Sequence, residues 1–258
     1  MRILTVGNSF SDDATSYLYE IAKSAGVDEN LYLGNLHVGG CSLDSHIKFF
    51  KENEGAYEYR TNVGDGWKTK YGATIFDGLL DGEWDLISFQ QASGFSGKAE
   101  TYEDLEELME LVRSKVGEKP IFAWHMTWAY AQNSQHPHFV EYENSQEKMY
   151  GAIVSAVKKK ILKNPKISKI APCGTAIQNA RNTCLGGFGE DLTRDGFHLD
   201  LNIGRYIAGL TLAKAFIGVD LSKVTFVPEL VTEDMRKIAI DCVQKAFEKM
   251  FSETQIEL

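Results

Sequence analysis

Short apolar runs alternate with longer amphipathic stretches along nearly the whole chain of 258 residues. The short runs fit strands buried on both faces, whereas the amphipathic stretches repeat apolar residues at helical spacing. Regular alternation of strands and helices predicts an α/β fold, in which helices cover both faces of a mostly parallel sheet. No internal repeat or low-complexity linker interrupts the pattern, so we expect residues 1–258 to form a single domain.

The individual elements can be assigned by range. Strands are predicted at 3–6, 31–38, 85–89, 120–124 and 167–172. Helices are predicted at 12–25, 42–50, 100–116, 141–162, 174–184, 201–217 and 232–251, with a glycine-rich loop at 185–198. Residues 56–72 differ, because alternating apolar side chains lead into Gly64-Asp65-Gly66, a pattern typical of a β-hairpin. We expect this hairpin to be an insertion at the edge of the main sheet.

The charge balance excludes one class of partner. The chain has 27 Lys and Arg against 36 Asp and Glu, a net charge of −9, whereas nucleic-acid binding requires clustered cations. No apolar run approaches the roughly 20 residues of a membrane span. The first residues reach Gly7 and polar positions too early for a signal peptide. We therefore expect a cytoplasmic protein with neither a nucleic-acid nor a membrane partner.

Metal ligands and disulfides are also poorly supported. The cysteines are widely spaced and include no CxxC pair, so we expect reduced thiols: Cys41, Cys173, Cys184 and Cys242. His136-Pro137-His138 offers two imidazoles but no evident third ligand. The sequence predicts no metal and no other cofactor.

The first loop carries a serine in a position suited to chemistry. Ligands of such folds bind at the carboxyl ends of the strands. Gly7-Asn8-Ser9-Phe10-Ser11 directly follows the first strand and precedes the first helix. A hydroxyl there lies at that edge of the sheet, and its backbone N–H lies near a helix N-terminus, where negative charge is favoured. The alternative is that Ser9 or Ser11 merely caps the helix.

The last loop supplies an acid and a base. In Asp195-Gly196-Phe197-His198, an Asp three residues before a His can reach the imidazole Nδ1. That contact fixes the tautomer and leaves Nε2 free to accept a proton. Alone, the pattern fits a surface loop with a capping Asp. Combined with the first loop, it predicts that Ser9, His198 and Asp195 act together.

Two further loops offer donors for an oxyanion hole. Val38-Gly39-Gly40-Cys41 follows the second strand, and its glycines expose backbone N–H groups. Gln90 and Gln91 follow the next strand, and either side-chain amide could donate to an oxyanion. The alternatives are a plain turn at Gly40 and glutamines that face solvent. Adjacent strand residues point to opposite faces, so the choice between the two glutamines stays open.

At this point the order of features resembles the SGNH (GDSL-like) hydrolase family. Gly7-Asn8-Ser9-Phe10-Ser11 is similar to its first block, with Asn8 where the family often has Asp. Gly39-Gly40 is similar to the second block, and Asp195-Gly196-Phe197-His198 to the fifth, DxxH. The resemblance covers residues 3 to about 217 and is greatest to a bacterial branch of uncharacterised SGNH-like proteins with a GNSF block. The third block differs from the family pattern. The asparagine of the usual GxND motif is missing, and Gln90 or Gln91 would take its place.

The resemblance implies a flavodoxin-like three-layer α/β/α fold and a serine esterase. Ser9 would be the nucleophile, His198 the general base and then acid, and Asp195 the group that orients His198. The N–H groups of Ser9 and Gly40, with one glutamine amide, would stabilise the oxyanion. Asn8 would hold the nucleophile turn in shape. The substrate would be a small-molecule or carbohydrate ester, with carbohydrate O-acetyl groups favoured, cleaved through an acyl-serine intermediate.

Aromatic residues after the fourth strand suggest a substrate platform. His125, Trp128 and Tyr130 follow that strand, and Trp128 is the residue most expected to contact substrate. Asn8, His125 and Trp128 make up the expected substrate-binding residues. The alternative is a partly buried structural cluster.

Three other functions remain open. The first is a lipase or thioesterase-like activity on longer acyl chains, although no long apolar lid is evident. The second is a non-catalytic carbohydrate- or partner-binding domain on the same scaffold, suggested by the irregular third block. The third is a nucleotide-binding flavodoxin-like protein, although the sequence has neither GxxxxGK[ST] nor GxGxxG after the first strand.

Overall fold

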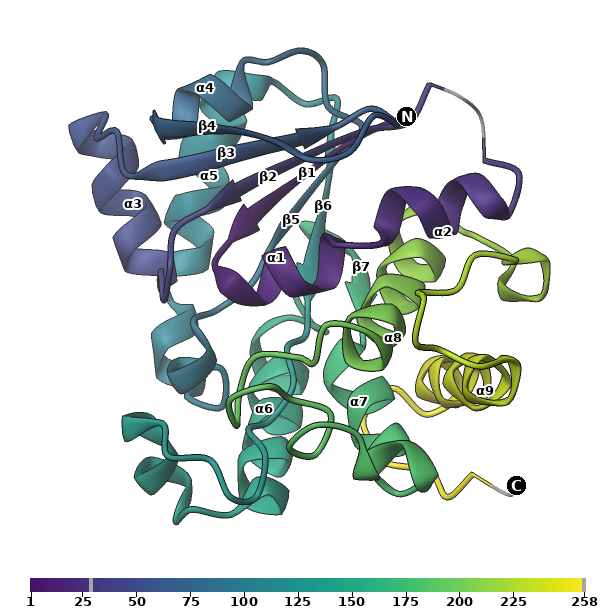
Figure 1. The fold of residues 1–258 in the computed structure, drawn as a ribbon. Helices are drawn as coiled ribbons and strands as arrows, with labels where there is room; N and C mark the ends of the chain where they lie inside the picture. Colours follow the sequence, from purple (N-terminus) through teal and green to yellow (C-terminus); the bar gives the residue numbers. More distant parts are fainter. Residues whose placement is uncertain (28–29, 257–258) are drawn as a thin grey trace.

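The computed structural model describes residues 1–27 and 30–256. A seven-stranded sheet forms its centre, in the order β4-β3-β2-β1-β5-β6-β7 (Figure 1). The strands are β1 Arg2–Gly7, β2 Tyr32–His37, β3 Tyr57–Asn62, β4 Lys68–Ala73, β5 Leu86–Phe89, β6 Ile121–His125 and β7 Ile167–Ala171. All pairings are parallel except β2–β3 and β3–β4. The predicted α/β class with a mostly parallel sheet is therefore confirmed, and the predicted hairpin forms the β3–β4 edge.

Helices lie on both sides of the sheet. The helices are α1 Ser9–Thr15, α2 Leu18–Ser24, α3 Leu43–Glu52, α4 Ile75–Leu79, α5 Asp104–Val116, α6 Gln146–Lys160, α7 Cys173–Arg181, α8 Ile203–Leu212 and α9 Glu233–Glu248. Figure 1 shows α3, α4 and α5 on one side and α1, α2 and α8 on the other. None of the helices in the described part of the chain is long and apolar enough to span a membrane.

The register of the sheet determines which residues meet at its carboxyl edge. Gly7 pairs with His37, while Val6 pairs with Phe89 and Phe89 with Trp124. The next residues along β5 and β6, Gln90 and His125, therefore lie at the level of Gly7. Below this line the buried side chains of the strands are mainly apolar, with Thr5, Asn35 and Ser88 among the polar ones.

The first helix differs from the prediction, because it begins at Ser9 and breaks before Leu18. The hydroxyls of Thr15 and Ser16 donate to the carbonyls of Ser11 and Asp12, both at 2.8 Å. The Trp67 indole N–H donates to the Ser16 carbonyl at 3.2 Å. These carbonyls are satisfied without a continuous helix, so the chain can turn between α1 and α2.

The helix predicted at 141–162 also begins later, at Gln146. Residues 137–142 form a 3-10 turn, after which Glu143 and Asn144 adopt positive φ angles of 58° and 51°. Two consecutive left-handed residues cannot continue a right-handed helix. Ser145 then caps α6, because its hydroxyl accepts from the Lys148 N–H at 3.3 Å.

Candidate active site

The turn between β1 and α1 presents Ser9 at the carboxyl edge of the sheet. Asn8 caps α1, and its Oδ1 accepts from the Phe10 N–H at 3.0 Å and from Gln90 Nε2 at 2.7 Å. Its Nδ2 donates to the Cys41 carbonyl at 3.0 Å. Asn8 thus ties the serine turn to the glycine turn that contains Gly40, and to the end of β5.

The loop before α8 brings two more predicted residues to this serine. His198 Nε2 lies 2.8 Å from Ser9 Oγ, and His198 Nδ1 lies 2.6 Å from Asp195 Oδ2. The other oxygen of Asp195 accepts from the N–H groups of His198 at 2.7 Å and Phe197 at 3.2 Å. With the ring proton on Nδ1 facing the carboxylate, Nε2 can accept the proton of the serine hydroxyl.

Asp195 is held in its charged form. Partial burial opposes ionisation, but the hydrogen bonds from the His198 ring and from the backbone N–H groups of His198 and Phe197 outweigh it. Together they keep the pKa of Asp195 below its ordinary value. A carboxylate at this position can stabilise a positive charge that forms on His198.

Two backbone N–H groups could serve as an oxyanion hole. Gly40 is exposed, with a φ of 65° that favours glycine, and its N–H bonds to no other described residue. Ser9 is the first residue of α1, so its N–H lacks a partner within the helix.

The two glutamines do not supply the expected side-chain donor. Gln91 is buried, its Oε1 accepts from the Leu43 and Ala92 N–H groups, and its Nε2 donates to Thr101. Both polar groups of Gln91 are thus engaged in the interior, and its role in an oxyanion hole stays a prediction that these contacts do not support. Gln90 is also buried, and its amide N–H donates to Asn8. It lies behind the serine turn, with its donor already used.

The residues expected to bind substrate lie beneath the site. Trp128 is fully buried, stacks on Phe10 with ring centroids 4.2 Å apart, and donates through Nε1 to the Phe197 carbonyl at 2.8 Å. His125 and Asn8 are only 3% and 1% exposed. Apolar packing and the hydrogen bonds of the sheet edge enclose all three, so their contact with substrate stays a prediction that this geometry does not support. The burial is in keeping with the alternative of a structural aromatic cluster.

His125 belongs to an uncharged buried chain of hydrogen bonds. Its Nδ1 lies 3.1 Å from Gln90 Oε1, and Gln90 in turn donates to Asn8. Burial lowers the pKa of His125 to about 3, so the imidazole is neutral at physiological pH. This chain supports the serine turn from below without any charged group.

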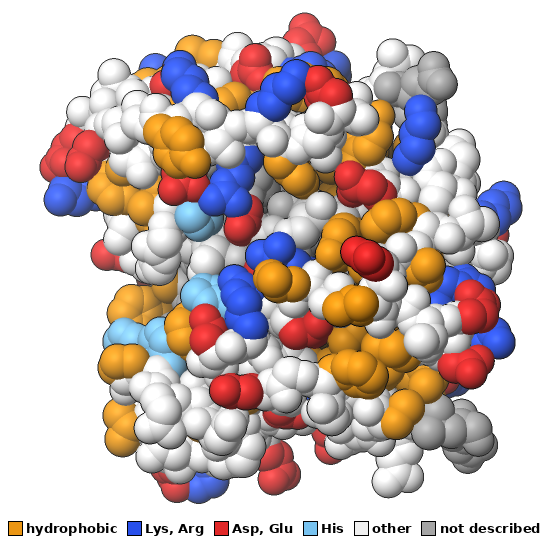
Figure 2. All heavy atoms as spheres, viewed as in Figure 1, with side chains coloured by type: hydrophobic (Ala, Val, Ile, Leu, Met, Phe, Trp, Pro, Cys, Tyr) orange, Lys and Arg blue, Asp and Glu red, His pale blue; other side chains and the backbone are white. Residues whose placement is uncertain are grey.

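A pocket of about 310 Å³ opens beside Gly40. It is lined by Gly40, Ala92, Ser93, Gly94, Phe95, His136, Pro137 and His138. The His136 ring lies 4.8 Å from that of Phe197, which adjoins His198. Figure 2 shows histidines close to basic and acidic side chains on the left part of the face viewed. The sequence signal for this pocket is the position of its three loops, after β2, β5 and β6.

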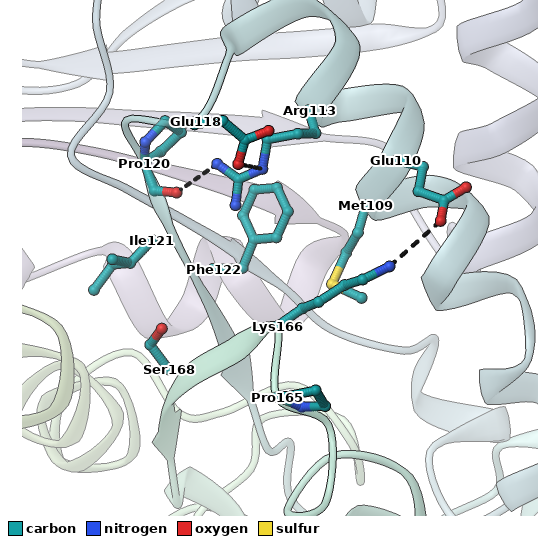
Figure 3. Close-up of a pocket in the computed structure, with 10 residues that line it drawn as sticks. All are labelled: Met109, Glu110, Arg113, Glu118, Pro120, Ile121, Phe122, Pro165, Lys166 and Ser168. Carbon is teal, nitrogen blue, oxygen red and sulfur yellow. Dashed lines mark hydrogen bonds and ion pairs between the residues drawn. The ribbon is translucent and has the colours of Figure 1, made fainter.

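A second pocket, of about 460 Å³, lies at the opposite end of the sheet (Figure 3). Ile121 opens β6 and Ser168 lies near the start of β7, so the pocket is at the amino ends of these strands. The Arg113 guanidinium lies over the Phe122 ring at 4.0 Å and donates to the Pro120 carbonyl at 2.8 Å. This pocket is separate from Ser9.

Comparison with solved structures finds a strong similarity to a member of a family of unknown function. A DUF4886 family protein from Bacteroides uniformis is 39% identical, with a TM-score of 0.92 over 99% of this chain and 98% of that one. Two others are much more distant. A candidate SGNH hydrolase from Slackia heliotrinireducens has 19% identity and a TM-score of 0.46, over 83% of this chain and 97% of that one. An acetylxylan esterase from Geobacillus stearothermophilus has 11% identity and a TM-score of 0.49, over 87% of this chain and 94% of that one.

No curated protein matches the chain. The family model of DUF4886, a domain of unknown function, matches residues 2–246. The chain therefore belongs to the DUF4886 family.

Proposed function

We propose that this protein is a serine hydrolase that cleaves small acyl esters. The observation that carries the proposal is the chain of contacts from Ser9 Oγ to His198 Nε2 at 2.8 Å and from His198 Nδ1 to Asp195 at 2.6 Å. A serine hydroxyl is a weak nucleophile unless a base accepts its proton, and the base must itself be oriented. Here one loop supplies both groups, at the edge of the sheet where ligands of such folds bind.

The geometry supports a two-step acyl transfer. Ser9 Oγ attacks the ester carbonyl as His198 takes its proton, and the Asp195 carboxylate stabilises the resulting imidazolium. The N–H groups of Ser9 and Gly40 donate to the oxyanion of the tetrahedral intermediate. His198 then protonates the departing alkoxide, leaving an acyl-serine. Water, deprotonated by His198, repeats the sequence and releases the acid.

The pocket beside Gly40 fits the alcohol half of the substrate. The leaving oxygen must face His198, which protonates it, and His136 lines the pocket on that side. The lining contains no Lys, Arg, Asp or Glu, so it suits an uncharged group. Phe95 and Pro137 offer apolar surfaces, while His136 and His138 offer ring nitrogens. A sugar ring has matching apolar faces and hydroxyls, which favours carbohydrate O-acetyl esters.

One observation favours a second candidate function. Gln90 and Gln91 are both engaged in the interior, so neither of these two amides is free to donate to an oxyanion. A loss of one such donor typically costs about 10²- to 10³-fold in rate. A non-catalytic carbohydrate-binding domain on the same scaffold would tolerate that loss entirely.

Hydrolysis of p-nitrophenyl acetate by the parent and by Ser9→Ala separates the two functions. The esterase predicts turnover in the parent and none above background in Ser9→Ala, with circular dichroism unchanged. Ser16→Ala is the matched control, because Ser16 follows the same helix and its hydroxyl only donates to the Asp12 carbonyl. Equal rates in the parent and Ser9→Ala would exclude Ser9 as the nucleophile. No turnover on acetate, octanoate or acetylated sugars, with sugar binding retained, would favour the binding domain.

A further inference from the structure

A buried carboxylate lies one helical turn after Ser9. Asp13 is on α1, and its side chain has no exposed surface. One oxygen accepts from Arg194 Nη1 at 3.0 Å and from Arg205 at 2.7 Å. The other accepts from the Leu199 N–H at 2.9 Å. The proposed reaction uses none of these contacts directly.

Two of the three partners of Asp13 flank the acid and the base. Arg194 immediately precedes Asp195, and Leu199 immediately follows His198. Arg194 also bonds through its side chain to the Leu199 carbonyl and through its N–H to the His198 carbonyl at 2.9 Å. Both ends of the four-residue stretch that carries Asp195 and His198 are therefore fastened to the helix that carries Ser9.

The other contacts of this stretch do not replace that attachment. The bonds from His198 and Phe197 to Asp195 fix the internal shape of the stretch but not its place on α1. The Trp128 indole N–H and the Ala131 N–H donate to the Phe197 and Gly196 carbonyls, both at 2.8 Å, so these bonds fix the stretch to the loop after β6 and not to α1. Among the described residues, residues 194–199 are joined to α1 by direct polar contacts of Asp13 and by the contact of His198 Nε2 with Ser9 Oγ.

We propose that Asp13 is a positioning residue, which holds His198 Nε2 within reach of Ser9 Oγ. This role rests on the proposed esterase function. Burying a carboxylate is costly unless charged and hydrogen-bonding partners compensate it, and here two guanidinium groups and one N–H do so. A displacement of about 1 Å at a reacting group can cost about 10²-fold in rate. Asp13→Asn removes the charge that both arginines share.

The test compares Asp13→Asn with Asp12→Asn, measured at 10 °C to keep both variants folded. Asp12 is the neighbouring carboxylate on α1 and pairs with Arg60, away from the 194–199 stretch. We expect kcat for p-nitrophenyl acetate to fall about 10²-fold in Asp13→Asn, with KM within about threefold of the parent. In Asp12→Asn, kcat should stay within about twofold of the parent value. A lower melting temperature in Asp13→Asn with kcat unchanged would overturn the positioning role and leave a structural one.

Arg194→Gln keeps the proposal testable if Asp13→Asn does not fold. Arg194 is one-third exposed, and its loss leaves Asp13 paired with Arg205 and Leu199. We expect kcat to fall about tenfold with KM unchanged. If kcat stays within twofold of the parent in whichever of Asp13→Asn and Arg194→Gln folds, the proposal is overturned.

A spectroscopic readout separates this proposal from the proposed function. The rings of His198 and Phe10 lie 6.0 Å apart, so a nuclear Overhauser effect between them reports the place of His198 on α1 and does not depend on turnover. We expect it in the parent and in Asp12→Asn, and expect it weakened or absent in Asp13→Asn. If the parent hydrolyses no ester but this pattern holds, the role of Asp13 in placing His198 stands and the esterase falls. If the parent turns over and Asp13→Asn keeps both the rate and the Overhauser effect, only the role of Asp13 falls.

Discussion

The two halves of the candidate site rest on different kinds of support. The Ser9 turn rests on uncharged hydrogen bonds that run from Asn8 through Gln90 to His125. The Asp195–His198 stretch rests on ion pairs, because Asp13 binds both Arg194 and Arg205. One half is held by neighbouring strand ends, and the other by a charge cluster between α1, the last loop and α8.

This difference reflects how each half is built. The register of a parallel sheet already aligns Gly7, Gln90 and His125, so neutral side chains suffice to join them. The loop at 188–200 has only isolated bridges at Thr193 and left-handed residues at Asp191 and Leu192. Such a segment has little regular structure of its own, and strong long-range contacts must fix its position.

The largest loss of kcat is expected from substitutions of His198 and Asp195, the two residues of the charged half that take part in the proposed reaction. His198→Ala removes the proton acceptor of Ser9 and should lower kcat about 10⁴-fold or more. Asp195→Asn keeps the size of the side chain but loses the charge that stabilises the imidazolium, and should lower kcat about 10³- to 10⁴-fold. Steady-state hydrolysis of p-nitrophenyl acetate measures both. A loss below tenfold in His198→Ala would contradict the assignment of the base.

Sequence reasoning reached the features that depend on short patterns. The strand–helix alternation gave the fold class, and the first and last loops pointed to Ser9, Asp195 and His198, which lie within hydrogen-bond distance in the structure. Short patterns do not show which side chains are buried. Trp128 follows a strand end, but Phe10 and Phe197 cover it. No pattern shows that Asp13 meets Arg194, which is 181 residues away.

Two buried neutral histidines, His125 in the uncharged half and His46 in the adjacent core, should make the free energy of unfolding depend on pH. Burial lowers the pKa of His125 and of His46 to about 3, whereas an unfolded histidine titrates near pH 6.5. Below pH 6.5 the unfolded chain binds more protons, so stability is full above that pH and is lost as the pH falls. From pH 7 to pH 5 these two residues should reduce the free energy of unfolding by about 4 kcal/mol.

Urea unfolding at several pH values measures this loss. In His125→Gln, which keeps a neutral polar side chain facing Gln90, about half of the pH dependence should disappear. His46→Gln should remove a similar share, although His46 contacts Tyr57 and lies outside the serine turn. If stability is equal at pH 7 and pH 5 in the parent, the neutral buried state of these histidines is wrong.

Asn8 offers a smaller effect on the same half. Asn8→Ala removes the helix cap, worth about 1 kcal/mol. It also leaves Gln90 Nε2 and the Cys41 carbonyl without a partner, so the total loss of stability should be about 2–4 kcal/mol. Asn8→Asp is the comparison, because it keeps an acceptor for Phe10 and Gln90. It loses the donor to Cys41 and adds a buried charge, which the N-terminus of α1 and these two donors partly compensate. Urea unfolding should show a smaller loss of stability in Asn8→Asp than in Asn8→Ala. Equal losses would argue against the role of Asn8 Oδ1 as an acceptor.

The smallest effect is expected where the two halves meet, in the pocket between Gly40 and His136. Phe95→Ala removes an apolar face of this pocket. It leaves the hydrogen bonds of Asn8, Gln90 and His125 and the ion pairs of Asp13 unchanged. We expect kcat/KM to fall about five- to tenfold for an acetylated methyl glycoside, roughly 1 kcal/mol of lost contact. Ethyl acetate should stay within twofold, because its alcohol half is too short to reach Phe95. Tyr71→Ala, which removes a largely exposed aromatic on β4, is the matched control and should change neither substrate. A loss in Phe95→Ala that is equal for both esters would mean that the pocket shapes the catalytic groups themselves, and the alcohol half would then have to lie elsewhere.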